Sequence, residues 1–340
     1  MRTIFSVLLL LLPAIASGQA VTIDLYTGEV PVASQDSAER RRALPQALEH
    51  VFQKQSGLRY FEDYPLIEPA LGNASSILLS FHYRNEETVL ADGSEGNVLR
   101  LVANFSEAKV DEMVQSLQLP LWKPDRPPLD TWVVVDDGVD RRTFPLEFSY
   151  AWRSMGAAAA RRGLNVRWPV PDEEGQYQID AQLLWGGYTE DLGAGQRGGV
   201  MIAAARREGL EWSVRNNVSY NGEDWTWRVQ DIDLQSALTQ SMQQAIDRIA
   251  AANTIAASEL GLWGYQLTIG GLGNAHDYQR CLAYLQSLSV VNHVSVISAG
   301  QGNVVFKLEL SAVPQYLEEA LGTGRFIELN EDNGKYFLLP

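Results

Sequence analysis

Four prolines that lie within nine residues divide this chain of 340 residues. Proline fixes φ and has no backbone N–H, so neither a continuous helix nor a central strand can pass through such a stretch. The chain also exceeds the size at which a single hydrophobic core stops growing. We therefore predict a proline-rich linker over residues 120–130, between a first domain over 21–119 and two further domains over 131–256 and 257–340. The four residues are Pro120, Pro124, Pro127 and Pro128.

The first domain shows strand and helix patterns in the order βαββα. We expect strands over residues 21–32, 77–84 and 98–105, and helices over 37–57 and 107–117. Gly57 supplies the stop of the first helix. Pro45 conflicts with a helix that begins at Ser37, so that helix must kink there or restart with Pro45 in its first turn. The order predicts an antiparallel sheet with helices on one face.

The second domain opens with a β-α-β pattern. Strands are expected over residues 131–135 and 164–168, on either side of a helix over 148–163 that ends at Gly163. Such a unit usually makes a parallel pair of strands with a right-handed crossover. Four antiparallel strands and a long helix are expected after it, over residues 179–188, 199–206, 210–220, 225–230 and 231–252. We therefore predict a mixed α/β sheet.

The third domain has the clearest pattern of the three. Phe306, Leu308 and Leu310 alternate with polar residues along a half-buried strand, and Cys281 and Leu285 line one face of a helix. The strands and helices follow in the order βαββαβ, which is the ferredoxin-like arrangement. The fold class predicted for the whole chain is α+β, with three small modules in series.

The first twenty residues have the layout of a secretory signal peptide. Met1-Arg2-Thr3 is a positively charged start, residues 4–15 are almost continuously apolar, and Gly18-Gln19-Ala20 places small residues at a cleavage site. The apolar run is too short for a membrane span, and no later segment is apolar enough for one. We expect an exported, periplasmic chain that is cleaved near Ala20 and then soluble. An uncleaved N-terminal anchor is the alternative.

A single cysteine and an acidic composition limit the chemistry further. Cys281 lies far from the cleavage region, so no lipobox cysteine carries a lipid, and one thiol forms neither an intramolecular disulfide nor a cysteine zinc site. Its place on a helical stripe with Tyr278 indicates a buried, inert thiol. The formal net charge of −15 argues against nucleic acid or an anionic lipid surface as a partner.

Few patterns in the sequence point to catalysis. Asp136, Asp137 and Asp140 follow an apolar strand, where carboxylates can hold a magnesium ion or act as a phosphatase nucleophile, but an Asp-Gly turn explains them as well. Residues 193–198 match GxGxxG, although strand patterns on both sides predict a hairpin loop there instead of a dinucleotide site. We therefore expect no cofactor, no metal ion and no enzymatic activity.

Two tryptophans are the remaining candidates for a binding site. Trp225 and Trp227 stand two residues apart in a predicted strand, so their rings lie on the same face of the sheet. Such a pair can form an aromatic platform for a sugar or a peptide. The alternative is that both rings fill the core between the sheet and a helix.

Several motifs resemble the Gram-negative family called domain of unknown function 2066. They are Val21-Thr22-Ile23-Asp24-Leu25-Tyr26, the arginine-rich helix that ends in Gln55-Ser56-Gly57, the Pro127-to-Trp132 entry to the second domain, and the Asp180-to-Gly186 segment, which looks like the family's later strand. The resemblance implies an uncharacterised periplasmic protein and no particular activity. In layout, the second domain is similar to the TolB N-terminal domain and to penicillin-binding-protein activators, and the first resembles domains of flagellar-assembly proteins and outer-membrane lipoproteins.

Three functional hypotheses follow from these observations. The leading one is a non-catalytic periplasmic protein that binds another envelope protein, as an assembly or accessory factor. The second is a module that binds peptidoglycan or polysaccharide through Trp225 and Trp227. The third is a metal-dependent hydrolase that uses Asp136, Asp137 and Asp140. An exposed apolar patch would favour a protein interface, whereas a deep polar cleft would favour catalysis.

Overall fold

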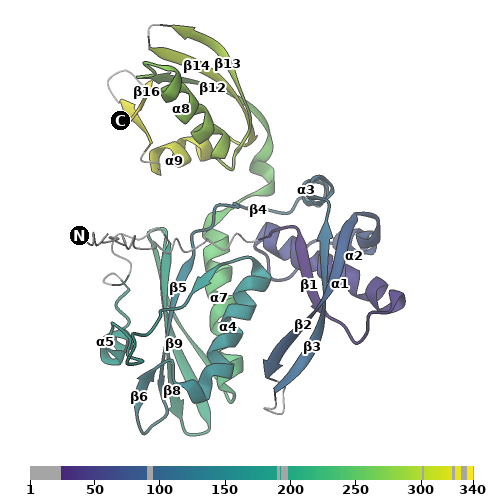
Figure 1. Cartoon of the computed structure of the whole chain (residues 1–340), viewed down its shortest axis with the longest axis vertical. Coiled ribbons are helices and arrows are strands. Elements are labelled where there is room, and N and C mark those ends of the chain that lie inside the picture. The colour runs from purple at the N-terminus through teal and green to yellow at the C-terminus, as the bar shows by residue number, and fades with distance from the viewer. Residues whose placement is uncertain are drawn as a thin grey trace, which may run out of the picture.

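The chain forms three modules, each with its own sheet and hydrophobic core (Figure 1). The computed structural model describes residues 24–89, 95–189, 192, 198–300, 302–323, 326–330 and 335–339. The signal peptide and most of the GxGxxG segment lie outside these residues. The predicted mixture of helices with several small sheets is confirmed. Within the described part of the chain, no helix is long and apolar enough to cross a membrane.

The first module spans residues 24–119 and has the predicted βαββα order, with a short extra helix. Its sheet has the antiparallel order β1-β3-β2, and α1 packs on it. Gly28 of β1 lies so close to the backbone of Ala47 in α1 that any side chain would clash there. The elements are β1 (Thr27–Pro31), α1 (Ser37–Ser56), α2 (Ile67–Gly72), β2 (Leu78–Val89), β3 (Glu95–Phe105) and α3 (Glu107–Ser116).

Helix α1 runs through Pro45 without a break. The interpretation that the helix restarts at Pro45 is therefore wrong. Leu44, Leu48 and Phe52 on the buried face of α1 are almost fully removed from solvent. Burying such side chains contributes about 1.5–3 kcal/mol each, which together outweighs the roughly 3 kcal/mol that an internal proline costs.

The middle module spans residues 129–253 and holds a six-stranded mixed sheet. The strand order is β10-β9-β8-β5-β6, and β7 also pairs with β5. The predicted parallel pairing across the first helix is confirmed, because β5 runs parallel to β7. Helices α4 and α7 cover one face of this sheet. The elements are β5 (Leu129–Asp136), β6 (Arg141–Thr143), α4 (Ser149–Arg162), β7 (Val166–Arg167), β8 (Gly199–Glu208), β9 (Glu211–Tyr220), β10 (Glu223–Asp231) and α7 (Leu234–Asn253).

The strand predicted over residues 179–188 is wrong, because that segment contains helix α5 (Ala181–Gly186). Both ends of α5 carry capping residues, which favour a helix over the strand that the apolar run between them suggests. The Asp180 carboxylate accepts a hydrogen bond of 2.6 Å from the Gln182 backbone N–H, and Gly187 adopts a left-handed φ of 81°. Leu184 of α5 packs on the opposite face of the sheet from α4 and α7.

The third module spans residues 260–339 and has the sheet order β13-β14-β12-β16-β15. The predicted contact between the helical stripe and the alternating strand is confirmed, since Cys281, Leu285, Phe306 and Leu308 are all fully buried in one core. The last two strands form a hairpin, so β16 lies next to β12 and runs parallel to it. The elements are β12 (Leu260–Gly270), α8 (Ala275–Ser287), β13 (Val291–Gly300), β14 (Asn303–Ala312), α9 (Gln315–Thr323), β15 (Ile327–Asn330) and β16 (Lys335–Leu338).

The segment predicted as a linker contains a short strand and three buried residues, Trp122, Arg126 and Leu129. Strand β4 (Leu121–Trp122) pairs with β11 (Thr254–Ile255), which follows α7 directly. Trp122 is 1% exposed and belongs to the core of the middle module, whereas Leu121 and Ile255 pack in the core of the third module. The three modules therefore meet at this two-stranded ladder, which lies at the centre of Figure 1.

Two buried arginines fasten the first module to the middle one. Arg126 donates through Nη2 to the Lys54 carbonyl oxygen (2.7 Å) and through Nη1 to the Gly163 carbonyl oxygen (3.0 Å). Arg162 donates through Nη2 to the Gly57 carbonyl oxygen (2.6 Å). These acceptors are the free carbonyls at the C-terminal ends of α1 and α4, where a cation also complements the helix dipole. Burial nevertheless lowers the pKa of Arg126 to about 9.

Candidate functional site

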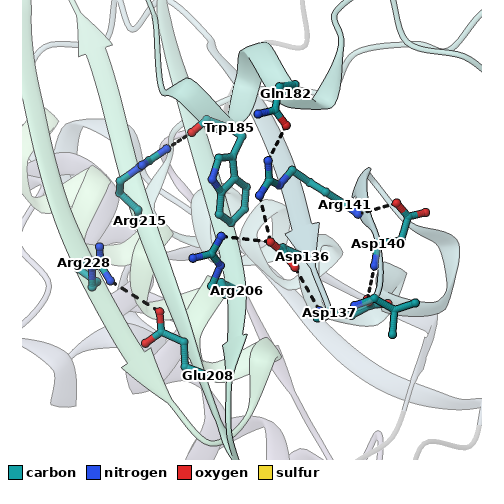
Figure 2. Close-up of polar contacts among 12 residues, drawn as sticks. Asp136, Asp137, Asp140, Arg141, Gln182, Trp185, Arg206, Glu208, Arg215 and Arg228 are labelled. Carbon is teal, nitrogen blue, oxygen red and sulfur yellow. Dashed lines mark hydrogen bonds and ion pairs between the residues drawn. The ribbon is translucent and has the colours of Figure 1, made fainter.

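Four arginines gather on the face of the middle sheet that α4 and α7 leave uncovered. Strand alternation and register bring them together. Arg215 of β9 lies directly opposite Arg228 of β10, and Arg206 of β8 lies opposite Asp136 of β5, which in turn lies opposite Arg141 of β6. We call Arg141, Arg206, Arg215 and Arg228 the arginine cluster (Figure 2).

Trp185 of α5 stands among three of these guanidinium groups, as Figure 2 shows. The Arg141, Arg206 and Arg215 guanidinium carbons lie 4.1, 5.1 and 5.9 Å from the centre of the indole ring. Arg215 also donates a hydrogen bond to the Trp185 carbonyl oxygen, and Arg141 donates one of 2.6 Å to the Gln182 side chain. Helix α5 therefore holds the arginines in place through both cation–π and hydrogen-bond contacts.

Two carboxylates partly balance the four positive charges. The Asp136 Oδ2 atom lies 3.1 Å from Arg141 Nη2 and 3.3 Å from Arg206 Nη2. The Glu208 carboxylate lies 4.0 Å from Arg228 Nη1. Like charges directly opposite on neighbouring strands destabilise a sheet. The pair of Arg215 and Arg228 therefore costs stability that these two carboxylates only partly offset.

Two arginine donors in the cluster are buried without an acceptor. These are the Nε atoms of Arg141 and Arg215, for which the described part of the chain supplies no hydrogen-bond partner. Burial lowers the pKa of Arg215, and the neighbouring charges of Arg228, Arg141 and Arg206 lower it further. Unsatisfied buried donors and unbalanced charge both indicate a place for an anion.

A small pocket of about 90 Å³ opens beside Trp185, between Arg206, Arg215 and Arg228. One water takes up about 30 Å³ of liquid, so the pocket has room for a group the size of a carboxylate or a phosphate. Arginine binds both groups through paired N–H donors. Arg206 and Arg228 have half-exposed side chains, which places them where a partner can reach them.

The structure separates the roles of the predicted aspartates. Asp136 belongs to the arginine cluster, as described above. The Asp137 carboxylate accepts hydrogen bonds from the backbone N–H groups of Asp140 and Val139, which lower its pKa, and it also pairs with Arg142 at 3.1 Å. Asp140 accepts from the Arg141 backbone N–H. These contacts are those of an ion-paired turn, and no metal-binding group of three or more His, Cys, Asp or Glu side chains occurs among the described residues.

Trp225 and Trp227 lie on the other face of the sheet, the one that α7 covers. Both rings are partly buried against the core of the middle module. The Arg248 guanidinium of α7 lies 4.3 Å from the centre of the Trp227 ring. The predicted shared face is thus observed, but it is the helix-covered face. A role as a sugar platform stays a prediction.

The arginine cluster cannot be recognised as a group in the sequence. Its four members come from four strands that span residues 141–228, and only the sheet register places them side by side. The prediction of a strand where α5 lies also hid the position of Trp185. An available signal was the alternation within β8 and within β9, which points Arg206 and Arg215 away from their core neighbours Ala205 and Val214.

Comparison with known proteins gives one family match. Residues 20–123 match the model of a family described as Domain of unknown function (DUF8605). This match covers the first module and β4, less than half of the chain, and the arginine cluster lies outside it. The resemblance to domain of unknown function 2066 stays a prediction. The chain matches none of the curated proteins and none of the solved structures.

Proposed function

We propose that this chain is an exported, non-catalytic binding protein of the periplasm that docks an acidic segment of another envelope protein onto the arginine cluster. The observation that carries this proposal is the unbalanced charge around Trp185, where, among the residues that the structure describes, four guanidinium groups face two carboxylates. The signal-peptide pattern of residues 1–20 supports the location in the periplasm.

The geometry of the cluster supports two different roles for its arginines. Arg141 and Arg215 are held by α5 and form a fixed base, whereas Arg206 and Arg228 are the more exposed pair. An acidic segment would place its carboxylates between the exposed pair and supply the missing acceptors. Because the chain as a whole carries a formal charge of −15, this local positive face would also orient an acidic partner.

Site-specific photo-crosslinking in intact cells tests this function. A photoreactive amino acid replaces Thr226, which neighbours Arg228 on β10, and a second variant carries it at Lys109 on the exposed side of α3. We expect a defined crosslinked partner from position 226 alone. Its crosslinked peptide should be rich in Asp or Glu. An equal yield from both positions, or none from either, refutes the proposal.

A matched pair of charge variants completes this test. Arg206→Gln removes a member of the cluster, and Arg207→Gln removes the same charge one residue later, on the opposite face. The Arg206 variant should abolish the crosslink from position 226, and the Arg207 variant should leave it unchanged. Equal effects of the two variants would mean that overall charge, and not the cluster, attracts the partner.

A further inference from the structure

A polar groove separates the β2–β3 hairpin of the first module from α4 and α7 of the middle module. Its volume of about 750 Å³ lies within the range of about 300–1,000 Å³ that ligand sites occupy. Glu86, Glu87 and Asn97 contribute from the hairpin, and Arg153, Arg161 and Gln235 contribute from the helices. This groove is distinct from the arginine cluster, which lies on the other face of the middle sheet.

The groove lies between two bodies that are fastened together at one end. Arg126 and Arg162 join the C-terminal end of α1 to the middle module, and α1 contacts α4. In Figure 1 the β2–β3 hairpin runs alongside α4 away from that junction. The buried hydrogen bonds therefore fix the spacing of the two walls before any ligand binds, which reduces the entropy that binding must offset.

The two walls of the groove present side chains of opposite charge. Arg153 and Arg161 are eight residues apart on α4, which places them about 12 Å apart along the helix axis. Glu86 and Glu87 lie on the hairpin wall. In the described part of the chain no ion pair crosses the groove. Glu86 pairs with Arg84 and Arg100 on its own side, whereas Glu87, Arg153 and Arg161 form no ion pair with any residue that the structure describes.

Arg161 presents an exposed guanidinium at the groove. Partial burial lowers its pKa, and the positive charge of Arg100 lowers it further. Among the described residues Arg161 forms no ion pair, so an anion that enters the groove would supply its exposed guanidinium with a charge partner. Glu87 sets a second requirement, because a purely anionic ligand would be repelled from the hairpin wall.

Uncharged polar groups lie between the charged ones. Gln235 and Thr239 stand one turn apart on α7 and line the groove together with Asn97. Amide side chains both donate and accept, as the peptide group itself requires. The half-exposed ring of Tyr150 adds one apolar surface. A lining of this kind suits an extended polar chain with one charge of each sign.

We infer that the groove binds a short peptide with free termini, with its carboxylate at Arg161 and its ammonium group at Glu87. The two charged walls give the peptide a direction, and the amide side chains pair with its backbone. This binding goes beyond the docking proposed for the arginine cluster and does not depend on it.

Calorimetric titration of the full mature chain with tetra-alanine tests the inference. We expect a measurable heat of binding at about 1 mM peptide, a concentration that detects weak complexes. Amidation of the peptide C-terminus and the Arg161→Gln variant should each weaken binding about tenfold, which corresponds to about 1.4 kcal/mol. Acetylation of the N-terminus and the Glu87→Gln variant should likewise each weaken it.

Pairing a variant with a modified peptide locates the contact. In Arg161→Gln, amidation should cause no further loss, because the group that the carboxylate binds is already absent. Arg207→Gln is the matched control and should bind tetra-alanine like the natural chain. Thermal unfolding of each variant verifies that the fold is retained.

The outcomes decide the proposal in either direction. Additive losses from Arg161→Gln and amidation would overturn the assigned contact, and so would absence of binding by the natural chain. Tighter binding of tetragalacturonate than of tetra-alanine would show that the groove takes an acidic glycan instead. Because the arginine cluster is intact in every variant used, the crosslink proposed above should persist whichever result is obtained.

Discussion

The Nη2 atom of Arg162 donates a hydrogen bond of 2.6 Å to the carbonyl oxygen of Gly57, which ties α4 to the end of α1 across 105 residues of chain. The same guanidinium donates to Gln243 at 2.8 Å and pairs with Asp247 at 2.9 Å. Its side chain is 2% exposed. Arg162 therefore joins the end of α1 to α4 and α7, and we expect the first and middle modules to unfold as a single cooperative unit.

Replacement of Arg162 by Met should destabilise this unit by about 3 kcal/mol, because it removes charged hydrogen bonds and leaves buried acceptors unpaired. Urea unfolding, followed by tryptophan fluorescence, measures the change. The matched control is Arg207→Met, on the surface, which should cost less than about 0.5 kcal/mol. Equal costs for the two variants would show that Arg162 does not join the modules.

Replacement of Arg228 should weaken partner binding without lowering the free energy of unfolding. Arg228→Gln removes the repulsion with Arg215, and its only ion pair, among the residues described, is the 4.0 Å contact with Glu208. We expect the free energy of unfolding to stay within about 0.5 kcal/mol of the natural value or to rise. Denaturation at low and high salt measures this. A decrease of more than about 1 kcal/mol in the free energy of unfolding would contradict our view that the arginines of the cluster repel one another until a partner binds.

Acidification should destabilise the first module through His50. Burial lowers the pKa of His50 to about 4, and its Nδ1 atom is 2.9 Å from the Glu29 carbonyl oxygen. The folded-state pKa lies below the unfolded value of about 6.5, so the unfolded chain takes up the proton first. Stability is therefore complete above pH 6.5 and is lost as the pH falls towards 4. From pH 7.5 to 5 the loss is about 2 kcal/mol.

The His50→Gln variant isolates this effect from the titration of the carboxylates. Its unfolding free energy, measured by urea denaturation at several pH values, should fall less than that of the natural chain between pH 7.5 and 5. Identical pH profiles would mean that His50 is already protonated in the folded state or is not buried.

Cys281 should react slowly in the native protein. It is fully buried between α8 and the sheet, and burial raises the pKa of its thiol to about 12. A thiol reagent should label it within minutes only after denaturant is added. Cys281→Ala should cost about 1 kcal/mol, whereas Leu308→Asp should bury an unpaired charge and unfold the third module. Rapid labelling under native conditions would show that the Cys281 thiol lies on the solvent-exposed face of α8 and not in the core.

The sequence correctly predicted the strands and helices whose pattern lies within a single element. Alternation from Phe306 to Leu310 and the helical stripe through Cys281 lie within single elements, and Gly57 and Gly163 adopt the left-handed conformation that ends a helix. The strand predicted at α5 failed because six residues are too few for a helical period to show. There the capping residues Asp180 and Gly187 decide the structure.

Contacts that join distant segments could not be predicted from one sequence. Arg126 was part of a predicted linker, yet its acceptors are carbonyl groups 72 residues before it and 37 after it. The arginine cluster depends in the same way on the register of four strands. Every residue has a backbone carbonyl, so the pattern of side chains does not show which carbonyl Arg126 will bind. The register between strands is fixed only when the whole sheet has formed, so the sequence does not show which arginines become neighbours.

The ladder of β4 and β11 also determines how the chain carries mechanical load. Residues 123–253 leave this ladder and return to it, so the chain enters and exits the middle module at adjacent points. A pull on the two ends of the protein would load the first module, the ladder and the third module in series, and the two residue pairs of the ladder would have to separate before tension passed along the chain of the middle module. The middle module is thus a closed loop of chain whose two ends lie side by side at the ladder.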